Sequence, residues 1–299
     1  MNTIIIIEKK SNCLRPFFGR PFLEHVIESL IERYINEIHI FCYENPDKIM
    51  AVAGNGEKWG STFHHHHIKN QDLSNIIVNS INTQNMTMVV NPDYIVKPNY
   101  KFVKFQKGFN TLFFKESSYT GWGLFPPDFF GQFNFKNPDQ LKNKLSSMNN
   151  ISEVVTNLLS VASYEEWLVS SNKVLSKNDS GIIIKSREPE EGVFNGRNTS
   201  IGKNTIIKAP VYIGENTVIG EGGVIGPFAT IGKNCRIDDQ TIIKNSLIDN
   251  NSYIGRAMNI EDSVIYGNRI FNTELSSEIA IEDKFLVSNF LQDQNSNYS

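Results

Sequence analysis

The fold of the C-terminal half is decided by residues 201–237, which read IGKNTI IKAPVY IGENTV IGEGGV IGPFAT IGKNCR I. An isoleucine recurs at every sixth position from Ile201 to Ile237 without interruption. Glycine follows it in most repeats, and we expect this glycine to form a tight corner at positive φ. Four positions after each isoleucine stands a residue of limited size, such as Thr205 or Ala229, which suits the narrow interior of a triangular coil. The repeat predicts a left-handed parallel β-helix of hexapeptide repeats.

The repeat continues less regularly beyond this stretch. After Ile237 the spacing shortens once, to Ile242, and a weaker pattern runs on to Ile270. At three hexads per coil, the span from about residue 194 to 271 predicts roughly four coils. Residues 272–299 are then a capping segment and flexible tail, in which Phe285–Leu291 is expected to cover the last coil and the polar residues after it to fray.

The N-terminal half alternates between strand and helix patterns. Strands are predicted over Ile4–Ile7, 37–43 and 86–90, and helical spacing occurs over 21–34 and again over 153–175. A strand, a helix and a strand in that order indicate a mainly parallel sheet. We therefore expect an α/β domain over 1–180 and the β-helix over 181–271. The apolar face of the first helix would hold Phe22, Val26, Leu30 and Tyr34.

Composition narrows the class of protein. With 40% hydrophobic residues and a net charge of -3, the chain can bury a core but offers no basic field for nucleic acid. The longest early apolar run, Ile4–Ile7, is too short for export or a membrane span. The three cysteines lie far apart without a CxxC pair, which fits a reducing compartment and no structural zinc. We expect a cytoplasmic protein.

Four short segments of the N-terminal half occur in the same order as four motifs of a known family. They are RPFLEHVIE at 20–28, GNGEKWG at 54–60, VVNPD at 89–93 and ASYEEW at 162–167. They resemble, in turn, the GKPLLEHVIE helix start, the GDGSxxG turn, the strand ending in a metal-binding Asp and the GTPEDY segment of the sugar-1-phosphate nucleotidyltransferases, or nucleotide-sugar pyrophosphorylases. The repeat around 225–232 is similar to that of the long glucose-1-phosphate thymidylyltransferases. The resemblance implies a truncated Rossmann-like nucleotidyltransferase domain before the β-helix.

The resemblance also implies a chemistry. In that family a sugar phosphate attacks the α-phosphate of a nucleoside triphosphate, and a GGxGTRLxP loop, a PKP-type lysine and Mg²⁺ hold the phosphates. The PKP lysine has no counterpart here, because only two residues separate Pro16 from Gly19. At positions where the family has glycine, a negative charge would repel a triphosphate, and any side chain would obstruct its close approach to the backbone. The loop positions for three glycines, threonine and arginine are occupied by Glu8, Lys9, Ser11, Asn12 and Cys13.

The metal site implied by the resemblance is incomplete as well. Asp93 matches the family's first metal-binding carboxylate, but the position of the second carboxylate holds Ser160. A single carboxylate holds Mg²⁺ weakly unless substrate phosphates add ligands. Following Asn91-Pro92, Asp93 could equally be a turn residue.

Further site candidates follow from the same alignment. In a rebuilt loop Lys9, Lys10 and Arg15 could bind an anion, although we favour the interpretation that they form a solvated strand edge. Lys115 is similar to the family's sugar-phosphate lysine, and Leu73 begins the segment that replaces its base-recognising LGTAGA. The catalytic candidates are Lys9, Arg15 and Lys115, and the nucleotide-binding candidates are Ser11, Asn12 and Leu73.

Three other features have competing interpretations. His64 and His66 would share one strand face at a ligand-like spacing, but no Cys, Asp or Glu adjoins the run His64–His67, so adventitious metal binding is favoured. The aromatic segment Phe125–Phe130 is expected to close a core rather than to stack a ligand. Cys13 is expected to be inert, because no histidine is placed by the sequence to activate it.

Several functions remain open. The first is a pyrophosphorylase-like protein that has lost most of its catalytic groups and acts as a binding, regulatory or scaffold subunit in nucleotide-sugar or polysaccharide metabolism. The second is an active sugar-1-phosphate nucleotidyltransferase with a rebuilt, Mg²⁺-dependent site. An acyltransferase is disfavoured, since no histidine lies beyond His67. Expected partners are further copies of the chain, contacted through the β-helix, or an active paralogue, with a nucleotide or nucleotide sugar as possible ligand.

Overall fold

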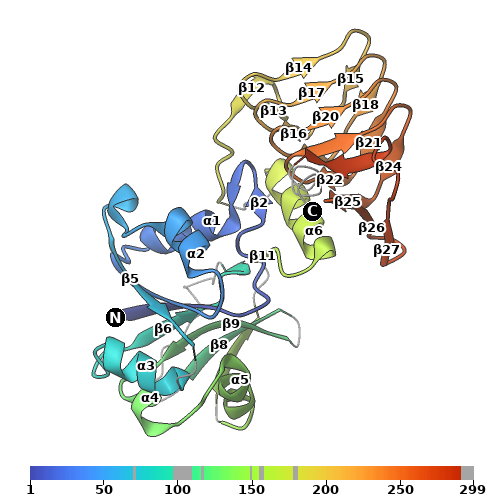
Figure 1. The fold of residues 1–299 in the computed structure, drawn as a ribbon. Coiled ribbons are helices and arrows are strands. Elements are labelled where there is room, and N and C mark those ends of the chain that lie inside the picture. The colour runs from blue at the N-terminus through green and yellow to red at the C-terminus, as the bar shows by residue number, and fades with distance from the viewer. Residues whose placement is uncertain are drawn as a thin grey trace. The chain divides into compact units, whose positions relative to one another are not determined.

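The computed structural model describes residues 1–69, 72–96, 110–115, 118–148, 150–154, 158–177 and 181–290. The chain forms two compact units (Figure 1). The first comprises Met1–Arg15 and Pro21–Ala162, and the second comprises Pro16–Arg20 and Ser163–Ser299. The division at Ala162 lies earlier than the expected boundary after residue 180, and residues 178–180 lie outside the described residues.

The first unit is built on a seven-stranded sheet in the order β10-β8-β9-β6-β1-β4-β5. β1 pairs in parallel with β4 and β6, and β4 pairs in parallel with β5, whereas β9 runs antiparallel to β6 and β8. This mixed, mostly parallel sheet confirms the α/β prediction. The strands are β1 (Asn2–Ile7), β4 (Glu37–Cys42), β5 (Thr62–His67), β6 (Thr87–Val90), β8 (Asn110–Lys115), β9 (Ser118–Phe125) and β10 (Asn150–Val154).

Helices accompany this sheet, and a short pair of strands adjoins it. The pair is antiparallel and joins β7 (Tyr94–Val96) to β11 (Leu158–Ser160). The predicted aromatic core is confirmed, since Phe125, Phe129 and Phe130 are buried in one cluster. The helices are α1 (Phe22–Ile31), α2 (Pro46–Ala53), the 3-10 helix η1 (Glu57–Trp59), α3 (Leu73–Ser80), α4 (Phe129–Gln132) and α5 (Pro138–Ser146).

Two helix predictions in this half were wrong in part. Helix α1 buries Phe22, Val26 and Leu30 as expected, but it ends at Ile31, and Tyr34 lies beyond it with φ of 61° and 92% of its surface exposed. Helical spacing was predicted over 153–175. Residues 150–154 and 158–160 form strands instead, and only Tyr164–Leu175 is helical, as α6. Sheet pairing with β8 and β7 outweighed the local periodicity there.

The second unit is a β-helix made of three parallel sheets, as predicted. Figure 1 shows its short strands stacked in layers. One sheet stacks β13 (Val193–Asn195), β16 (Val211–Ile213), β19 (Ala229–Ile231), β22 (Ser246–Ile248) and β25 (Ser263–Tyr266). The second stacks β14 (Ser200–Ile201), β17 (Val218–Ile219), β20 (Arg236–Ile237) and β23 (Ser252–Ile254). The third stacks β15 (Ile206–Ile207), β18 (Val224–Ile225), β21 (Ile242–Lys244) and β24 (Asn259–Glu261).

The repeated isoleucines and the small residues point inward. Ile213 pairs in register with Ile231, and Ile231 with Ile248, and all three are at most 1% exposed. At the small positions, Thr217 and Thr241 are buried, and each hydroxyl donates to a backbone carbonyl, of Gly232 at 2.9 Å and of Gly255 at 2.8 Å. The small column therefore fills the interior without leaving these hydroxyls unsatisfied.

The positive φ predicted for the glycine column is confirmed at Gly226, with φ of 93°, and is wrong at Gly202 and Gly214. In those two repeats the left-handed corner lies two residues later, for example at Asn216 with φ of 56°. A Cβ on Gly214 would lie 2.5 Å from the carbonyl carbon and oxygen of Gly232 in the next coil. These glycines are therefore needed for close stacking of coils, and short polar side chains, mainly asparagine, form the corners.

The end of the β-helix is closed by antiparallel strands, β26 (Arg269–Asn272), β27 (Ser277–Ala280) and β28 (Val287–Asn289). β28 pairs with β23, and Val287 is completely buried in the β-helix core. Within the segment expected to cover the last coil, Val287 is buried and Phe285 is 81% exposed. Leu291 and the polar tail after it, for which fraying was predicted, lie outside the described residues.

Helix α6 belongs to the second unit through its own contacts. The Trp167 indole N–H donates to the Pro16 carbonyl at 3.1 Å, Asn172 donates to Asn245 at 2.6 Å, and the Tyr164 ring stacks on Tyr266. The remaining strands are β2 (Pro16–Phe17), β3 (Arg20–Pro21) and β12 (Arg187–Glu190). Among the described residues, no helix is long and apolar enough to cross a membrane.

Candidate functional site

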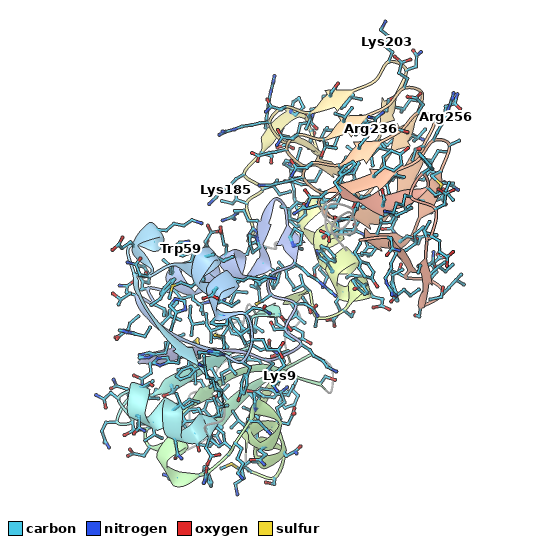
Figure 2. All side chains as sticks on the ribbon, in the orientation of Figure 1. Lys9, Trp59, Lys185, Lys203, Arg236 and Arg256 are labelled. Atoms are coloured by element: carbon cyan, nitrogen blue, oxygen red, sulfur yellow. The ribbon has the colours of Figure 1, made fainter. Side chains whose placement is uncertain are left out.

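The loop after β1 is a tight turn rather than an open phosphate-binding loop. The Ser11 N–H donates to the Glu8 carbonyl at 3.1 Å, which closes a turn with Lys9 and Lys10 at its exposed tip. Lys9 is labelled in Figure 2. The Glu8 carboxylate pairs with the Lys142 ammonium at 2.9 Å. The two lysines thus lie at a solvated edge, as the favoured interpretation predicted, and Glu8 has an ion-pair partner.

Asp93 is joined directly to this loop. Its Oδ1 accepts a hydrogen bond from the Ser11 hydroxyl at 2.7 Å and another from the Asn12 backbone N–H at 2.8 Å. The side chain is buried, and burial raises the pKa of Asp93, although the Ser11 and Asn12 hydrogen bonds and the nearby Arg15 oppose that rise. The carboxylate therefore closes the loop that, in the resembling family, holds a triphosphate.

The turn interpretation of Asp93 is supported by its own backbone. The Asp93 N–H donates to the Asn91 side-chain oxygen at 3.0 Å, which is an Asx turn at the end of β6. The same residue thus has two structural roles, in the turn and in the loop. The hydrogen bonds described for its carboxylate all go to Oδ1.

A third segment, residues 160–162, meets the loop and Asp93. The Asn12 side-chain amide donates to the Ala162 carbonyl at 2.9 Å, and the Arg15 guanidinium donates to the Val161 carbonyl at 2.8 Å. The Val161 N–H donates to the Asp93 carbonyl at 3.0 Å. The fold therefore brings Ser11, Asn12 and Arg15 close to Asp93, which lies at least 78 positions later in the sequence.

The residues present do not form a Mg²⁺ site of the family type. Ser160 is buried, and its hydroxyl accepts the Ala162 N–H at 3.1 Å. Mg²⁺ prefers several oxygen ligands in octahedral geometry, commonly one or two carboxylates with water and phosphate. Of the two positions at which the family has metal-binding carboxylates, only Asp93 carries one here, and its Oδ1 already accepts two hydrogen bonds. No catalytic step through Mg²⁺ follows from this donor set.

The space beside the loop is small. A hollow of about 20 Å³ is lined by Glu8, Asn91, Tyr119, Gly121 and Lys142 among the described residues. One water molecule needs about 10–15 Å³ by this kind of measure, so the hollow holds roughly one water and no phosphate chain. The ion pair of Glu8 with Lys142 lies at its wall.

The remaining predicted site residues lie apart from this group or cannot be judged. Leu73 is completely buried in the α/β core, so its side chain is closed to ligands. Lys115 is the last residue of β8, and its side chain lies outside the described part of the chain. Burial raises the pKa of Cys13 to about 12, and the side chain is 1% exposed, in keeping with the prediction of an inert thiol.

A second group of polar side chains lies on the same sheet, and the sequence reasoning missed half of it. β4 and β5 pair in parallel so that His39 lies opposite His64, with Glu37 two residues earlier on β4. The His64 Nε2 lies 3.1 Å from the Glu37 carboxylate. The prediction that no acidic residue adjoins the histidine run is thus wrong in space. The alternation Glu37-x-His39 on the neighbouring predicted strand was the available signal.

Comparisons with known proteins agree with this architecture. Residues 189–291 match the family model described as the GMPPB C-terminal domain. No curated protein matches the chain. Among solved structures, a putative glucose-1-phosphate thymidylyltransferase from Bacillus anthracis, in complex with a sucrose, is 14% identical with a TM-score of 0.44, covering 61% of this chain and 96% of that one. Over residues 189–291, which include most of the β-helix and its closing strands, the chain is therefore similar to the GMPPB C-terminal domain.

Proposed function

We propose that this protein is a catalytically degenerate nucleotide-sugar pyrophosphorylase-like subunit, with a binding, regulatory or scaffold role in nucleotide-sugar or polysaccharide metabolism. One observation carries the proposal: Ser11 and Asn12, at positions where the resembling family has its phosphate-binding loop, both donate to Asp93 Oδ1. A loop whose donors are used by a carboxylate inside the protein does not offer them to an incoming phosphate.

Charge and space support the same conclusion. Glu8 and Asp93 are both carboxylates near the place where a triphosphate would have to lie, and like charges repel strongly in a partly buried site. The hollow of about 20 Å³ beside Glu8 has no room for a phosphate chain. Restoring the site would require breaking the two hydrogen bonds to Asp93 and the Glu8–Lys142 pair.

A second candidate is an active sugar-1-phosphate nucleotidyltransferase with a remodelled site. It is favoured by the way Arg15 and Asp93 meet the loop, since a guanidinium and a carboxylate could hold a phosphate and, with substrate oxygens, a Mg²⁺ ion. Lys9, Lys10 and Lys115 would supply further positive charge in this alternative.

The deciding experiment measures pyrophosphate release. Purified full-length protein and Mg²⁺ are incubated with each nucleoside triphosphate and a panel of sugar 1-phosphates, and the melting temperature is recorded with each ligand. We expect no turnover above the rate without protein, and an increase in melting temperature with a nucleotide or nucleotide sugar if the subunit senses one. A silent thermal assay would direct the search for a scaffold role to protein partners.

The control distinguishes a contaminating enzyme from a rebuilt site. Asp93→Asn is compared with Asp47→Asn, an exposed carboxylate in the first turn of α2. Turnover that Asp93→Asn abolishes and Asp47→Asn leaves intact would overturn the proposal in favour of the active enzyme. Turnover unchanged in both variants would be assigned to a contaminant and would leave the degenerate site as proposed.

Assembly and location are parts of the same proposal. A β-helix presents flat sheet faces on which further copies can stack, so we propose a homo-oligomer formed through this unit, or a complex with an active paralogue. A cytoplasmic location remains a prediction. Light scattering of the full chain during size-exclusion chromatography tests the first idea, because a monomeric mass at micromolar concentration would contradict it.

A further inference from the structure

An edge of the α/β sheet gathers a carboxylate and three imidazoles on one face. β5 is the last strand in the sheet order, and it pairs in register with β4, so that His39 lies opposite His64 and Phe41 opposite His66. The His39 ring stacks on both His64 and His66, with centroids 4.6 and 5.4 Å apart. The period of two along each strand places these side chains with Glu37 on the same face.

Three ligand atoms of this group converge. One atom each from Glu37, His39 and His64 lies within 4.8 Å of the others. The Glu37 Oε1 is 3.1 Å from His64 Nε2 and 4.0 Å from His39 Nε2. Ligand atoms about 2.0–2.2 Å from a tetrahedral Zn²⁺ are separated by roughly 3.3 Å, so small side-chain rotations bring these atoms to ligand distances.

A chain of hydrogen bonds determines which His39 nitrogen is free to bind a cation. The Ser80 hydroxyl donates to the Ile76 carbonyl at 2.7 Å, so its oxygen is left to accept from His66 Nδ1 at 3.4 Å. His66 Nε2, 3.2 Å from His39 Nδ1, then accepts the proton carried by that nitrogen. In this tautomer the lone pair is on His39 Nε2, which lies 4.0 Å from the Glu37 Oε1. Orientation of a ligating histidine through its other nitrogen is the usual arrangement in metal sites.

Solvent access to the three side chains suits a ligand set as well. The exposed fraction of the side chain increases from 10% for His39 to 42% for His64 and 68% for Glu37. The inner ligand is therefore held rigidly while the outer two face solvent and leave a path for an ion.

We propose that Glu37, His39 and His64 form a binding site for a late first-row divalent metal ion, tested as Zn²⁺, with His66 as a positioning residue. Two imidazoles and a carboxylate are a donor set that Zn²⁺ accepts, with a fourth position open to water, whereas Mg²⁺ prefers oxygen ligands alone. The ion would join edge strand β5 to β4, because each strand supplies at least one ligand.

The competing explanation is adventitious binding by four adjacent histidines. His65 does not take part in the cluster, since its Nε2 contacts the Gly54 carbonyl at 2.7 Å, and His67 is an exposed residue of the same run. The two explanations predict different effects of substitutions at Glu37 and His67. The built site needs Glu37 and not His67, while a flexible run would use His67 as readily as His64.

The test titrates metal-free protein, prepared by chelation, with ZnCl₂ against a chromogenic chelator. Glu37→Gln is the decisive variant, because the Glu37 side chain is exposed and we expect the substitution to leave folding intact. We expect Glu37→Gln and His64→Gln each to weaken Zn²⁺ binding by about 10-fold or more. His67→Gln, the matched control, should change the dissociation constant less than 3-fold. Zn²⁺ should raise the melting temperature of the wild-type protein and of His67→Gln alike.

Co²⁺ absorption tests the role of His66. The visible bands of bound Co²⁺ report the ligand set, so Glu37→Gln and His64→Gln should change their shape. His66→Gln should weaken binding and leave the band shape unchanged, because it positions His39 without binding the ion. Absence of Zn²⁺ binding in the titration would overturn the proposal. So would equal losses in His64→Gln and His67→Gln, or a Glu37→Gln variant that binds as the wild type does.

Discussion

The β-helix and the α/β unit differ in how closely each keeps to the pattern it resembles. In the β-helix, each coil packs directly on the next, and Ile213, Ile231 and Ile248 follow one another in register. In the α/β unit the sheet is kept, but the loop after β1 is closed by Asp93. Coil stacking constrains every repeat, whereas a loop beside a stable sheet can change without loss of the fold. Architecture and active-site chemistry are therefore separable in this chain.

The largest effect is expected from a single methyl group in the β-helix. Gly214→Ala places a Cβ 2.5 Å from the backbone of Gly232, which must shift, and we expect a loss of about 3 kcal/mol or more in the free energy of unfolding. The matched control is Gly131→Ala in helix α4, where a Cβ meets nothing within 4 Å. Urea unfolding followed by circular dichroism measures both, and a neutral Gly214→Ala would contradict the stacking role of the glycine column.

A somewhat smaller effect is expected where the family's arginine is restored. Cys13→Arg forces a long cation into a position that is 1% exposed, and we expect a loss of about 2 kcal/mol or more with no gain of pyrophosphate release. Cys13→Ser is the control for removing the thiol. Melting temperature and the pyrophosphate assay report the two effects. A stable Cys13→Arg protein that gains turnover would show that the loop can still open.

The corners of the β-helix should respond more mildly. Asn216 has φ of 56°, and its amide donates to Asn234 in the next coil at 3.1 Å. We expect Asn216→Ala to lose about 1–2 kcal/mol, because alanine resists the left-handed region. Asn216→Gly keeps the backbone accessible and should lose less. If Asn216→Gly unfolds at a lower urea concentration than Asn216→Ala, the amide hydrogen bond to Asn234, rather than the backbone conformation, stabilises the corner.

The smallest effect concerns the closed site. Burial raises the pKa of Asp93 above its usual value, so the folded state favours the protonated form, and that contribution is lost as the pH rises through the folded pKa. We expect Asp93→Asn to change stability by less than about 1 kcal/mol and to remove this pH dependence. Unfolding free energies of both proteins at pH 4 to 7 check it. A difference that grows in favour of the wild type with rising pH would reverse the sign.

Much of the fold was predictable, and the errors have physical causes. The isoleucine period gave the β-helix, because an interior position returns at a constant spacing along the chain. The corner glycines were misjudged, because contact with the next coil is not a property of one repeat. Residues 153–154 and 158–160 lie in a stretch with helical spacing and form strands, since pairing with β8 and β7 outweighs local periodicity.

The sequence by itself determined the order of the units, the inward residues of the β-helix and the non-glycine residues of the loop after β1, because each follows from local spacing or residue type. Only the tertiary structure decided that Ser11 and Asn12 bond to Asp93, and that Glu37 and His39 lie beside His64. Both groups depend on segments brought together by the sheet. Such contacts between distant segments follow from strand order and register, which no single segment encodes.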